Sequence, residues 1–374
     1  MEVQFLDLVA QHAGLKNEIL AAWSALLDRA GFIGGAPVAQ LEEEFAAACQ
    51  AKHCVAVSNG TDALFLVYKA LGLSAGDEVI VPANTFIATS ESITAAGGQV
   101  VFADCLPGTY NLDPASVERA ITPRTKGIVA VHLYGQPADL DSLGAIARRH
   151  NLWLVEDAAQ AHLSEYKGRR IGSIGTAATF SFYPGKNMGA CGDAGAITTA
   201  DADLARRIRI LRDHGSEKKY VHLVEGFNMR CDALQAAALR IKLRHLPEWN
   251  ESRRRIAARY MERLRGVDDI ILPEVSPDCL PVWHLFIVQV PARDQVQQIL
   301  MNAGVHTGLH YPVPLHLQEA YEHLGYVEGA FPVAESVAKR LLSRPMYAEL
   351  TDAQVDYVCD CLVRAVASIA IPAL

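Results

Sequence analysis

The sequence predicts an α/β fold with a mainly parallel central sheet and helices on both faces. Short apolar runs rich in β-branched residues alternate with helix-like stretches through the first half of the chain. The runs are apolar throughout, as strands covered on both faces are. Ligands bind at the carboxyl ends of strands in such sheets, so the residues after each run are candidate site residues.

The predicted elements begin with an amphipathic stretch over residues 15–27. Seven strand-like runs follow, at 53–57, 78–81, 99–103, 127–133, 152–156, 178–182 and 195–199. Helix-like stretches lie between most of them, at 61–71, 85–96, 114–120 and 139–149. This alternation is typical of strand–helix–strand units.

The pattern changes in the second half of the chain. A long helical stretch covers 232–264 and is expected to break near Pro247, because proline cannot donate a helical hydrogen bond. A strand-like run at 282–290 then precedes helix-like stretches at 295–303, 333–342 and 352–368. We predict a large domain over residues 1–245 and a smaller α+β domain over residues 246–374.

Composition narrows the class of protein. The 374 residues are 51% hydrophobic and 20% charged, as in an ordinary globular protein, and the net charge of -8 argues against a nucleic-acid partner. The one basic cluster, residues 253–255, is expected to form a solvated helix face. The start of the chain does not resemble a signal peptide and no long apolar stretch predicts a membrane span, so a cytoplasmic protein is expected.

The eight cysteines are scattered and form no C-x-x-C pair. This spacing indicates neither a zinc site nor a disulfide framework, and no metal is expected.

The first candidate motif is S-N-G-T-D-A at residues 58–63, between a strand-like run and a helix. Small residues there, Gly60 and Thr61 among them, allow backbone N–H groups and the positive helix end to hold a phosphate. A plain strand-to-helix turn with an N-cap is the alternative. The motif lacks G-x-G-x-x-G, which weakens a nicotinamide-dependent oxidoreductase as a function.

The second motif places Asp157 at the end of an apolar run and Gln160 three residues later. A carboxylate in that position rarely lies buried without a partner. It can face a cationic ring nitrogen, as in a pyridoxal enzyme, or cap the next helix.

The third motif is a Gly/Pro-rich loop that carries Lys186 after the strand-like run at 178–182. Partial burial favours the neutral, nucleophilic form of a lysine, which forms Schiff bases with carbonyls. A surface lysine is the alternative for this residue alone, but the three motifs together occur in the order that a pyridoxal site requires.

These motifs resemble those of the DegT/DnrJ/EryC1/StrS family of nucleotide-sugar aminotransferases. The matching segments are F-L-D-L at 5–8, N-G-T-D-A-L at 59–64, P-A-N-T-F at 82–86, L-Y-G-Q at 133–136, E-D-A-A-Q at 156–160, S-F-Y-P-G-K-N at 181–187, R-D-H-G at 212–215, G-F-N-M-R at 226–230 and H-Y-P at 310–312. The resemblance therefore covers nearly the whole chain, in order.

The resemblance implies an aspartate aminotransferase-like fold (PLP fold type I), pyridoxal 5'-phosphate as cofactor, and a homodimer with shared active sites. It makes Lys186 the catalytic Schiff-base lysine, with Asp157 on the pyridinium nitrogen and Gln160 on the phenolic oxygen. The phosphate would be held by Gly60, Thr61, Ser181 and, from the partner subunit, Asn228. Phe86 would stack on the ring face, although a core aromatic is an equal alternative on spacing alone.

The implied substrates are L-glutamate and a nucleotide-linked keto-sugar. The loop around Lys186 is similar to that of members acting at C3 of a dTDP-linked 3-keto-6-deoxyhexose. A UDP-linked 3-keto sugar, a C4 keto-sugar and a catalytically silent pyridoxal-binding protein are the alternatives. Tyr183, His310 and Tyr311 are the candidate substrate contacts. An amino acid or cyclitol substrate also stays open, because Arg230 is available for a carboxylate.

Overall fold

The computed structural model describes residues 1–370 and contains one large sheet in the order β1-β9-β8-β5-β4-β2-β3. Its strands are β1 (His53–Val57), β2 (Glu78–Pro82), β3 (Gln99–Ala103), β4 (Thr125–Val131), β5 (Trp153–Asp157), β8 (Ala177–Ser181) and β9 (Gly195–Thr199). β9 runs antiparallel to β1 and β8, and the other neighbours are parallel. The predicted mainly parallel sheet, built from the seven expected runs, is confirmed.

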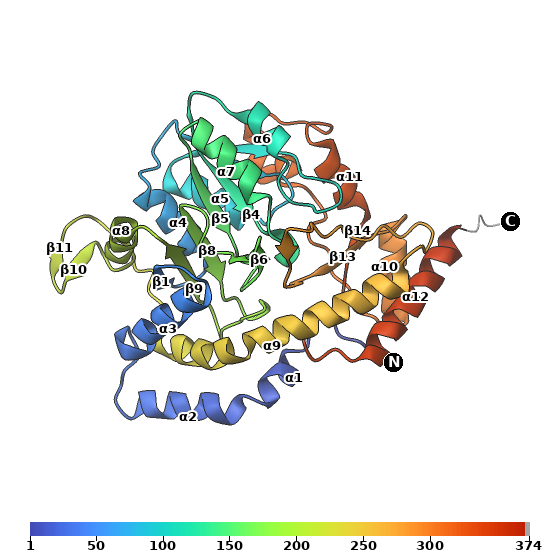
Figure 1. Ribbon diagram of the computed structural model, residues 1–374, viewed down its shortest axis with the longest axis horizontal. Coiled ribbons are helices and arrows are strands. Elements are labelled where there is room, and N and C mark those ends of the chain that lie inside the picture. The colour runs from blue at the N-terminus through green and yellow to red at the C-terminus, as the bar shows by residue number, and fades with distance from the viewer. Residues whose placement is uncertain (371–374) are drawn as a thin grey trace.

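Helices cover both faces of this sheet (Figure 1). Val79 and Val81 of β2 pack into a core with α4 (Gly60–Ala70), α5 (Ala88–Ala96) and α8 (Ala202–Arg212). Ile80, between them, faces the opposite core with α3 (Gly35–Ala48), α6 (Pro114–Ala120), α7 (Leu140–Arg149) and the first half of α9 (Ala233–Leu264). The alternation follows from the two-residue period of a strand. The sequence patterns did not predict α3 and α8.

The long helix α9 runs beneath the sheet from α2 and α3 at one end to α12 at the other (Figure 1). The expected break at Pro247 is wrong, because the helix is continuous through it. Leu246 and Asn250, on either side of the proline, are buried, and their tertiary packing outweighs the one hydrogen bond that proline removes. The proposed boundary after residue 245 falls inside this helix and stays a prediction.

The C-terminal part packs a third core around β13 (Phe286–Gln289) and β14 (Leu341–Arg344), which pair antiparallel. Its helices are α10 (Arg293–Asn302), α11 (Pro332–Arg340) and α12 (Asp352–Ala370), with short 3-10 turns η2 (Leu315–Leu317) and η3 (Glu319–Leu324). The helix expected over 333–342 ends at Arg340, because the next residues pair with β13.

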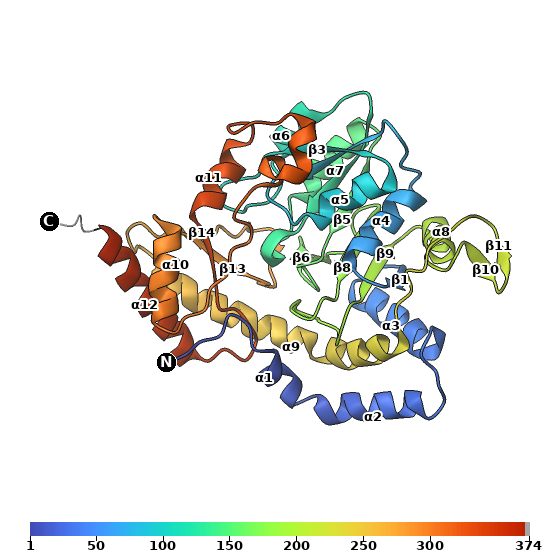
Figure 2. The same ribbon diagram turned by 180° about the vertical axis from the view of Figure 1, so that it is seen from behind.

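The remaining elements lie at the periphery. Helices α1 (Leu8–Ala13) and α2 (Lys16–Leu27) lie on the outer side of α9, and Figure 2 shows them from behind. β6 (Glu165–Tyr166), β7 (Arg169–Arg170) and β12 (Cys279–Leu280) form a small sheet, while β10 (Ser216–Lys218) and β11 (Val221–His222) form a hairpin that projects beside α8 in both views. Across residues 1–370, none of the helices has the length and apolarity needed to cross a membrane.

One expectation about the surface is wrong. Arg253 does not belong to a solvated helix face but is 2% exposed. Its Nη1 donates to the backbone oxygens of Trp283 (3.0 Å), His284 (3.2 Å) and Met346 (3.0 Å). Three carbonyl acceptors offset part of the cost of burying the guanidinium. Only the neighbouring Arg255 is exposed as expected.

Candidate active site

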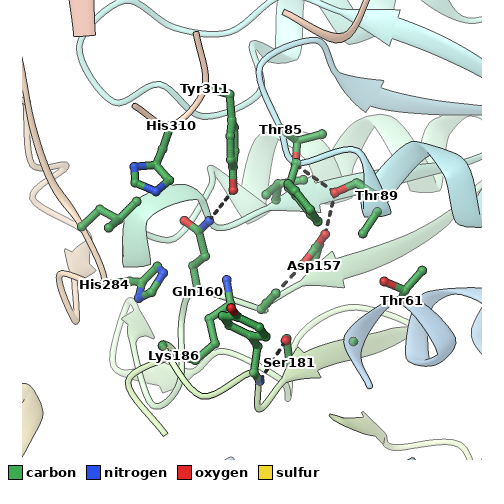
Figure 3. Close-up of a pocket in the computed structure, with 18 of the residues that line it drawn as sticks. Thr61, Thr85, Thr89, Asp157, Gln160, Ser181, Lys186, His284, His310 and Tyr311 are labelled. Carbon is green, nitrogen blue, oxygen red and sulfur yellow. Dashed lines mark hydrogen bonds between the residues drawn. The ribbon is translucent and has the colours of Figure 1, made fainter. Parts of the chain in front are cut away.

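The main cavity of about 860 Å³ lies at the carboxyl ends of the parallel strands. Asp157 and Ser181, the last residues of β5 and β8, line it, as does the start of α4. Of the residues proposed from the sequence, the cavity brings together Gly60, Thr61, Phe86, Asp157, Gln160, Ser181, Tyr183, Lys186, His310 and Tyr311. Figure 3 shows most of these side chains converging on one space.

Two residues considered from the sequence do not line this cavity. Asn228 is exposed and forms an isolated β-bridge with Asp213. Arg230 donates from Nη1 to Asp213 Oδ1 at 2.8 Å. The expected contribution of Asn228 to a partner's site, and that of Arg230 to a carboxylate, therefore stay predictions.

The start of α4 provides a cradle for an anion. Asn59 caps the helix, its Oδ1 accepting from the Asp62 N–H at 2.8 Å. A Cβ on Gly60 would lie 2.7 Å from Ser181 Cβ, so only glycine allows this close approach. The turn is therefore an N-capped strand-to-helix turn, as the alternative expected. The same turn also lines the cavity, where helix N–H groups favour a phosphate.

Asp157 is buried on the cavity wall, 5% exposed. Its Oδ2 accepts from Thr89 Oγ1 at 2.8 Å and its Oδ1 from the Ala159 N–H at 3.2 Å. Thr89 in turn is hydrogen-bonded to Thr85 at 2.8 Å between the two Oγ1 atoms (Figure 3). Within residues 1–370 no Lys, Arg or His forms an ion pair with Asp157. A buried carboxylate that forms no ion pair fits a ligand that supplies a positive charge.

The loop after β8 holds Lys186 in the cavity floor. The Lys186 N–H donates to Tyr183 O at 2.8 Å, and the Ala190 N–H donates to Phe182 O at 2.7 Å, which closes the loop on itself. Burial lowers the pKa of Lys186 to about 8, although the charge of Asp157 opposes this. A substantial fraction of the amine is therefore neutral and nucleophilic near neutral pH.

Gln160 is oriented by the backbone. Its Oε1 accepts from the Tyr134 N–H at 2.6 Å, so its amide Nε2 points to the cavity and donates to Tyr311 Oη at 3.3 Å. Phe86 lies 5.6 Å from the Tyr311 ring and is 53% exposed. Phe86 is therefore not a core aromatic, and an amide donor and two rings face the same space.

His310 is held on three sides. Its Nδ1 lies 2.8 Å from Ser343 Oγ, its ring stacks on Phe5 at 5.6 Å, and Tyr134 Oη donates to its backbone oxygen. Burial, together with the charge of Lys186, lowers the pKa of His310 to about 4, so the imidazole is neutral.

Sequence reasoning missed several residues of the cavity wall. Thr85 and Thr89 are spaced as residues on one helix face are, which could have indicated them. Phe5 belongs to a segment that the resemblance includes, but nothing in its residue type indicates a site. His284 follows a tryptophan in a stretch with no motif, so its position depends on tertiary structure alone.

Together these groups fit pyridoxal phosphate. The cavity offers a lysine amine of lowered pKa, a phosphate cradle, a buried carboxylate that forms no ion pair, and an oriented amide donor. Each matches one functional group of the cofactor: the carbonyl, the phosphate, the ring nitrogen and the phenolic oxygen.

Comparison with known proteins gives the same answer. The model of the DegT/DnrJ/EryC1/StrS aminotransferase family matches residues 14–363. The chain belongs to this family. It is 50% identical over 358 residues to the erythromycin biosynthesis sensory transduction protein EryC1 of Saccharopolyspora erythraea, covering 96% of this chain and 98% of the relative. It is 47% identical to the dTDP-3-amino-3,4,6-trideoxy-alpha-D-glucose transaminase of Streptomyces venezuelae, covering 96% and 94%.

Solved structures of the family confirm the fold. S. venezuelae DesV, determined in complex with a ketimine intermediate, has a TM-score of 0.95 and 47% identity, and the match covers 97% of this chain and 98% of DesV. Other family structures contain the cofactor in its pyridoxamine form, PMP. The expected PLP fold type I, the cofactor and the sugar aminotransferase class are therefore confirmed.

Proposed function

We propose that this nucleotide-sugar aminotransferase moves an amino group from L-glutamate to C3 of a dTDP-linked 3-keto-6-deoxyhexose. The observation that carries the proposal is one cavity in which a lysine of lowered pKa and a buried carboxylate that forms no ion pair lie together. The similarity to a dTDP-3-amino sugar transaminase supports this choice of sugar.

Pyridoxal phosphate, when bound, supplies an electron sink for the substrate C–H bond that is broken. In our proposal Lys186 Nζ holds its carbonyl carbon, and the Asp157 carboxylate pairs with its ring nitrogen. Gln160 Nε2 would donate to its phenolic oxygen, leaving Tyr311 Oη as a second neighbour. Gly60, Thr61 and Ser181 would hold its phosphate.

Lys186 is also the proposed acid and base of both half-reactions. Once an incoming amine displaces its Nζ, the free lysine amine would take the proton from the substrate carbon and deliver it to the carbon on the other side of the shared nitrogen. In the second half-reaction it would move a proton in the opposite direction. A pKa of about 8 suits this exchange, because the protonated and neutral forms are both populated near neutral pH.

The sugar side of the proposal involves Tyr183, His310 and Tyr311. Tyr183 is 60% exposed at the cavity mouth, where a hydroxyl is available to a sugar or phosphate. The neutral His310 offers a ring nitrogen without adding a charge. We further propose a cytoplasmic homodimer in which the partner subunit's Asn228 completes the phosphate site.

The test is a two-stage assay on the purified enzyme. L-glutamate is added first and the visible band of the lysine-bound cofactor is followed. The dTDP-linked 3-keto sugar is then added, with its UDP-linked counterpart and the 4-keto isomer in parallel, and the amino sugar is identified by mass spectrometry. We expect bleaching with glutamate and the fastest return of the band with the dTDP-linked 3-keto sugar.

Other outcomes separate the alternatives. Faster recovery with a UDP-linked or 4-keto sugar would contradict the proposed sugar but not the chemistry. A cofactor band that no amino donor bleaches would indicate a silent binder. Recovery with an amino-acid keto partner but with none of the sugars would favour an amino-acid aminotransferase.

A further inference from the structure

His284 lies on the cavity wall beside Lys186, and no sequence motif indicated it. Figure 3 shows its ring and Asp157 on opposite sides of Lys186. Its Nδ1 lies 3.1 Å from the side-chain oxygen of Asn187, the residue after the lysine. One hydrogen bond therefore joins this histidine to the loop that positions Lys186.

The protonation of His284 follows from the groups beyond Asn187. The Asn187 Nδ2 donates to two acceptors, Val282 O at 2.9 Å and Asn250 Oδ1 at 3.0 Å. Asn250 Nδ2 donates to the backbone oxygen of His162 at 2.9 Å. Backbone oxygens only accept, so both amide orientations are fixed and Asn187 Oδ1 must be the acceptor.

The proton that Asn187 Oδ1 accepts must come from His284 Nδ1. The other ring nitrogen, Nε2, is then without a proton in the neutral ring and can accept a hydrogen bond. Burial, together with the positive charges of Lys186 and Arg253, lowers the pKa of His284 well below its ordinary value, which keeps the ring neutral.

The backbone around His284 is also fixed by hydrogen bonds. The buried Arg253 donates to the backbone oxygens of Trp283 and His284 and to that of Met346, which also lines the cavity. This guanidinium fixes the segment from behind, from α9. The acceptor nitrogen of His284 is thus placed by contacts on both sides of the residue.

We propose that His284 is a positioning residue for Lys186, with Nε2 as the hydrogen-bond acceptor for the Lys186 ammonium whenever that amine is free. The proposal rests on the proposed role of Lys186 as the cofactor lysine. A released lysine must carry a proton between two carbons, and a neutral acceptor holds its ammonium without trapping it. A carboxylate there would hold the proton far more strongly.

Other ionisable groups around the pair are consistent with this role. Asp157, from β5, favours the charged amine. His310 and His162, from two other segments, are neutral because burial lowers their pKa values to about 4 and about 3. Arg253 from α9 disfavours any positive charge on His284. These surroundings therefore favour the neutral form of His284, in which Nε2 can accept a hydrogen bond.

The test measures the pKa of the free Lys186 in the full chain loaded with pyridoxamine phosphate. Acetylation by trace acetic anhydride is followed against pH by peptide mass spectrometry, with the exposed Lys52 as internal reference. His284→Asn keeps an N–H for Asn187 but removes the cavity acceptor. His284→Gln places an amide oxygen near the position of Nε2.

We expect the pKa of Lys186 to fall by about one unit or more in His284→Asn, because a lost hydrogen bond to a charged group disfavours the ammonium. His284→Gln should stay close to the unmodified enzyme. An unchanged pKa in His284→Asn, or an equal fall in His284→Gln, would overturn the proposal.

A measurement on the unmodified enzyme covers the case in which a variant does not fold. Nitrogen NMR of histidine-labelled protein should show His284 with its proton on Nδ1 between about pH 6 and about pH 9. A proton on Nε2 would contradict the assignment. Failure of pyridoxamine phosphate to bind would instead count against the proposed function.

Discussion

Glu156 supports the cofactor strand from the face opposite Asp157, and its removal provides a quantitative test. The side chain is fully buried. Oε1 accepts from the N–H groups of Ile174 (3.1 Å) and Gly175 (2.6 Å). Oε2 accepts from His132 Nε2 (3.2 Å) and the Gly172 N–H (3.2 Å). His132 donates there because its Nδ1 accepts from the Ala138 N–H.

Glu156→Gln changes one of these oxygens into an NH2 group. Whichever oxygen is replaced, two of the four donors then face another donor. Each hydrogen bond to a buried charged group contributes about 1.5 to 3 kcal/mol, so the free energy of unfolding should fall by about 3 to 6 kcal/mol. Urea unfolding of the cofactor-free protein, followed by circular dichroism, measures this loss. The exposed Glu248→Gln is the matched control.

The stability that Glu156 contributes should also depend on pH, in a direction that its pKa determines. Burial raises the pKa of Glu156, but the hydrogen bonds from His132, Gly175 and Gly172 outweigh it and the pKa is lowered. Such a group stabilises the fold above its unfolded pKa of about 4.3, and this stabilisation is lost as the pH falls through the lower folded value. The free energy of unfolding of Glu156→Gln should therefore change less with pH in that window. A loss under about 1 kcal/mol, or an unchanged acid profile, would refute the reasoning.

Three further predictions concern the cofactor. Gly60→Ala brings a Cβ to 2.7 Å from Ser181 Cβ and should weaken pyridoxal phosphate binding at least about tenfold in a fluorescence titration, whereas Gly14→Ala, in open space and with an ordinary negative φ, should not. Thr89→Val removes the hydroxyl donor to Asp157 and should weaken binding about tenfold; an unchanged affinity would show that this hydrogen bond is dispensable. The rate at which the cofactor-free enzyme captures pyridoxal phosphate should rise about tenfold per pH unit below about pH 8 and level off above it, because only neutral Lys186 reacts; a continued rise to about pH 10 would contradict its lowered pKa.

Local patterns were sufficient for the part of the fold that carries the chemistry. All seven strands of the large sheet were predicted because strands buried on both faces are continuous apolar runs. Asp157 and Lys186 were identified because they follow such runs. The continuity of the helix through Pro247 was not predicted, because it depends on burial of Leu246 and Asn250 against other parts of the chain.

Two residues around the site were not predicted for the same reason. Arg253 appeared to belong to a basic surface cluster, and only the fold brings three backbone oxygens to its guanidinium. His284 has no motif, and its tautomer follows from a chain of hydrogen bonds among residues distant in sequence. Sequence spacing identifies residues that a strand end presents, but not contacts that depend on packing between distant segments.

The most direct test of the proposed active site is to locate the lysine that holds the cofactor. The yellow enzyme is reduced with borohydride, digested, and mapped by mass spectrometry. We predict the added cofactor mass on Lys186 alone, and none on Lys242, a fully buried lysine that donates to Gly189 O at 2.6 Å. The cofactor on any other lysine, or an undiminished band in Lys186→Ala, would contradict the central claim.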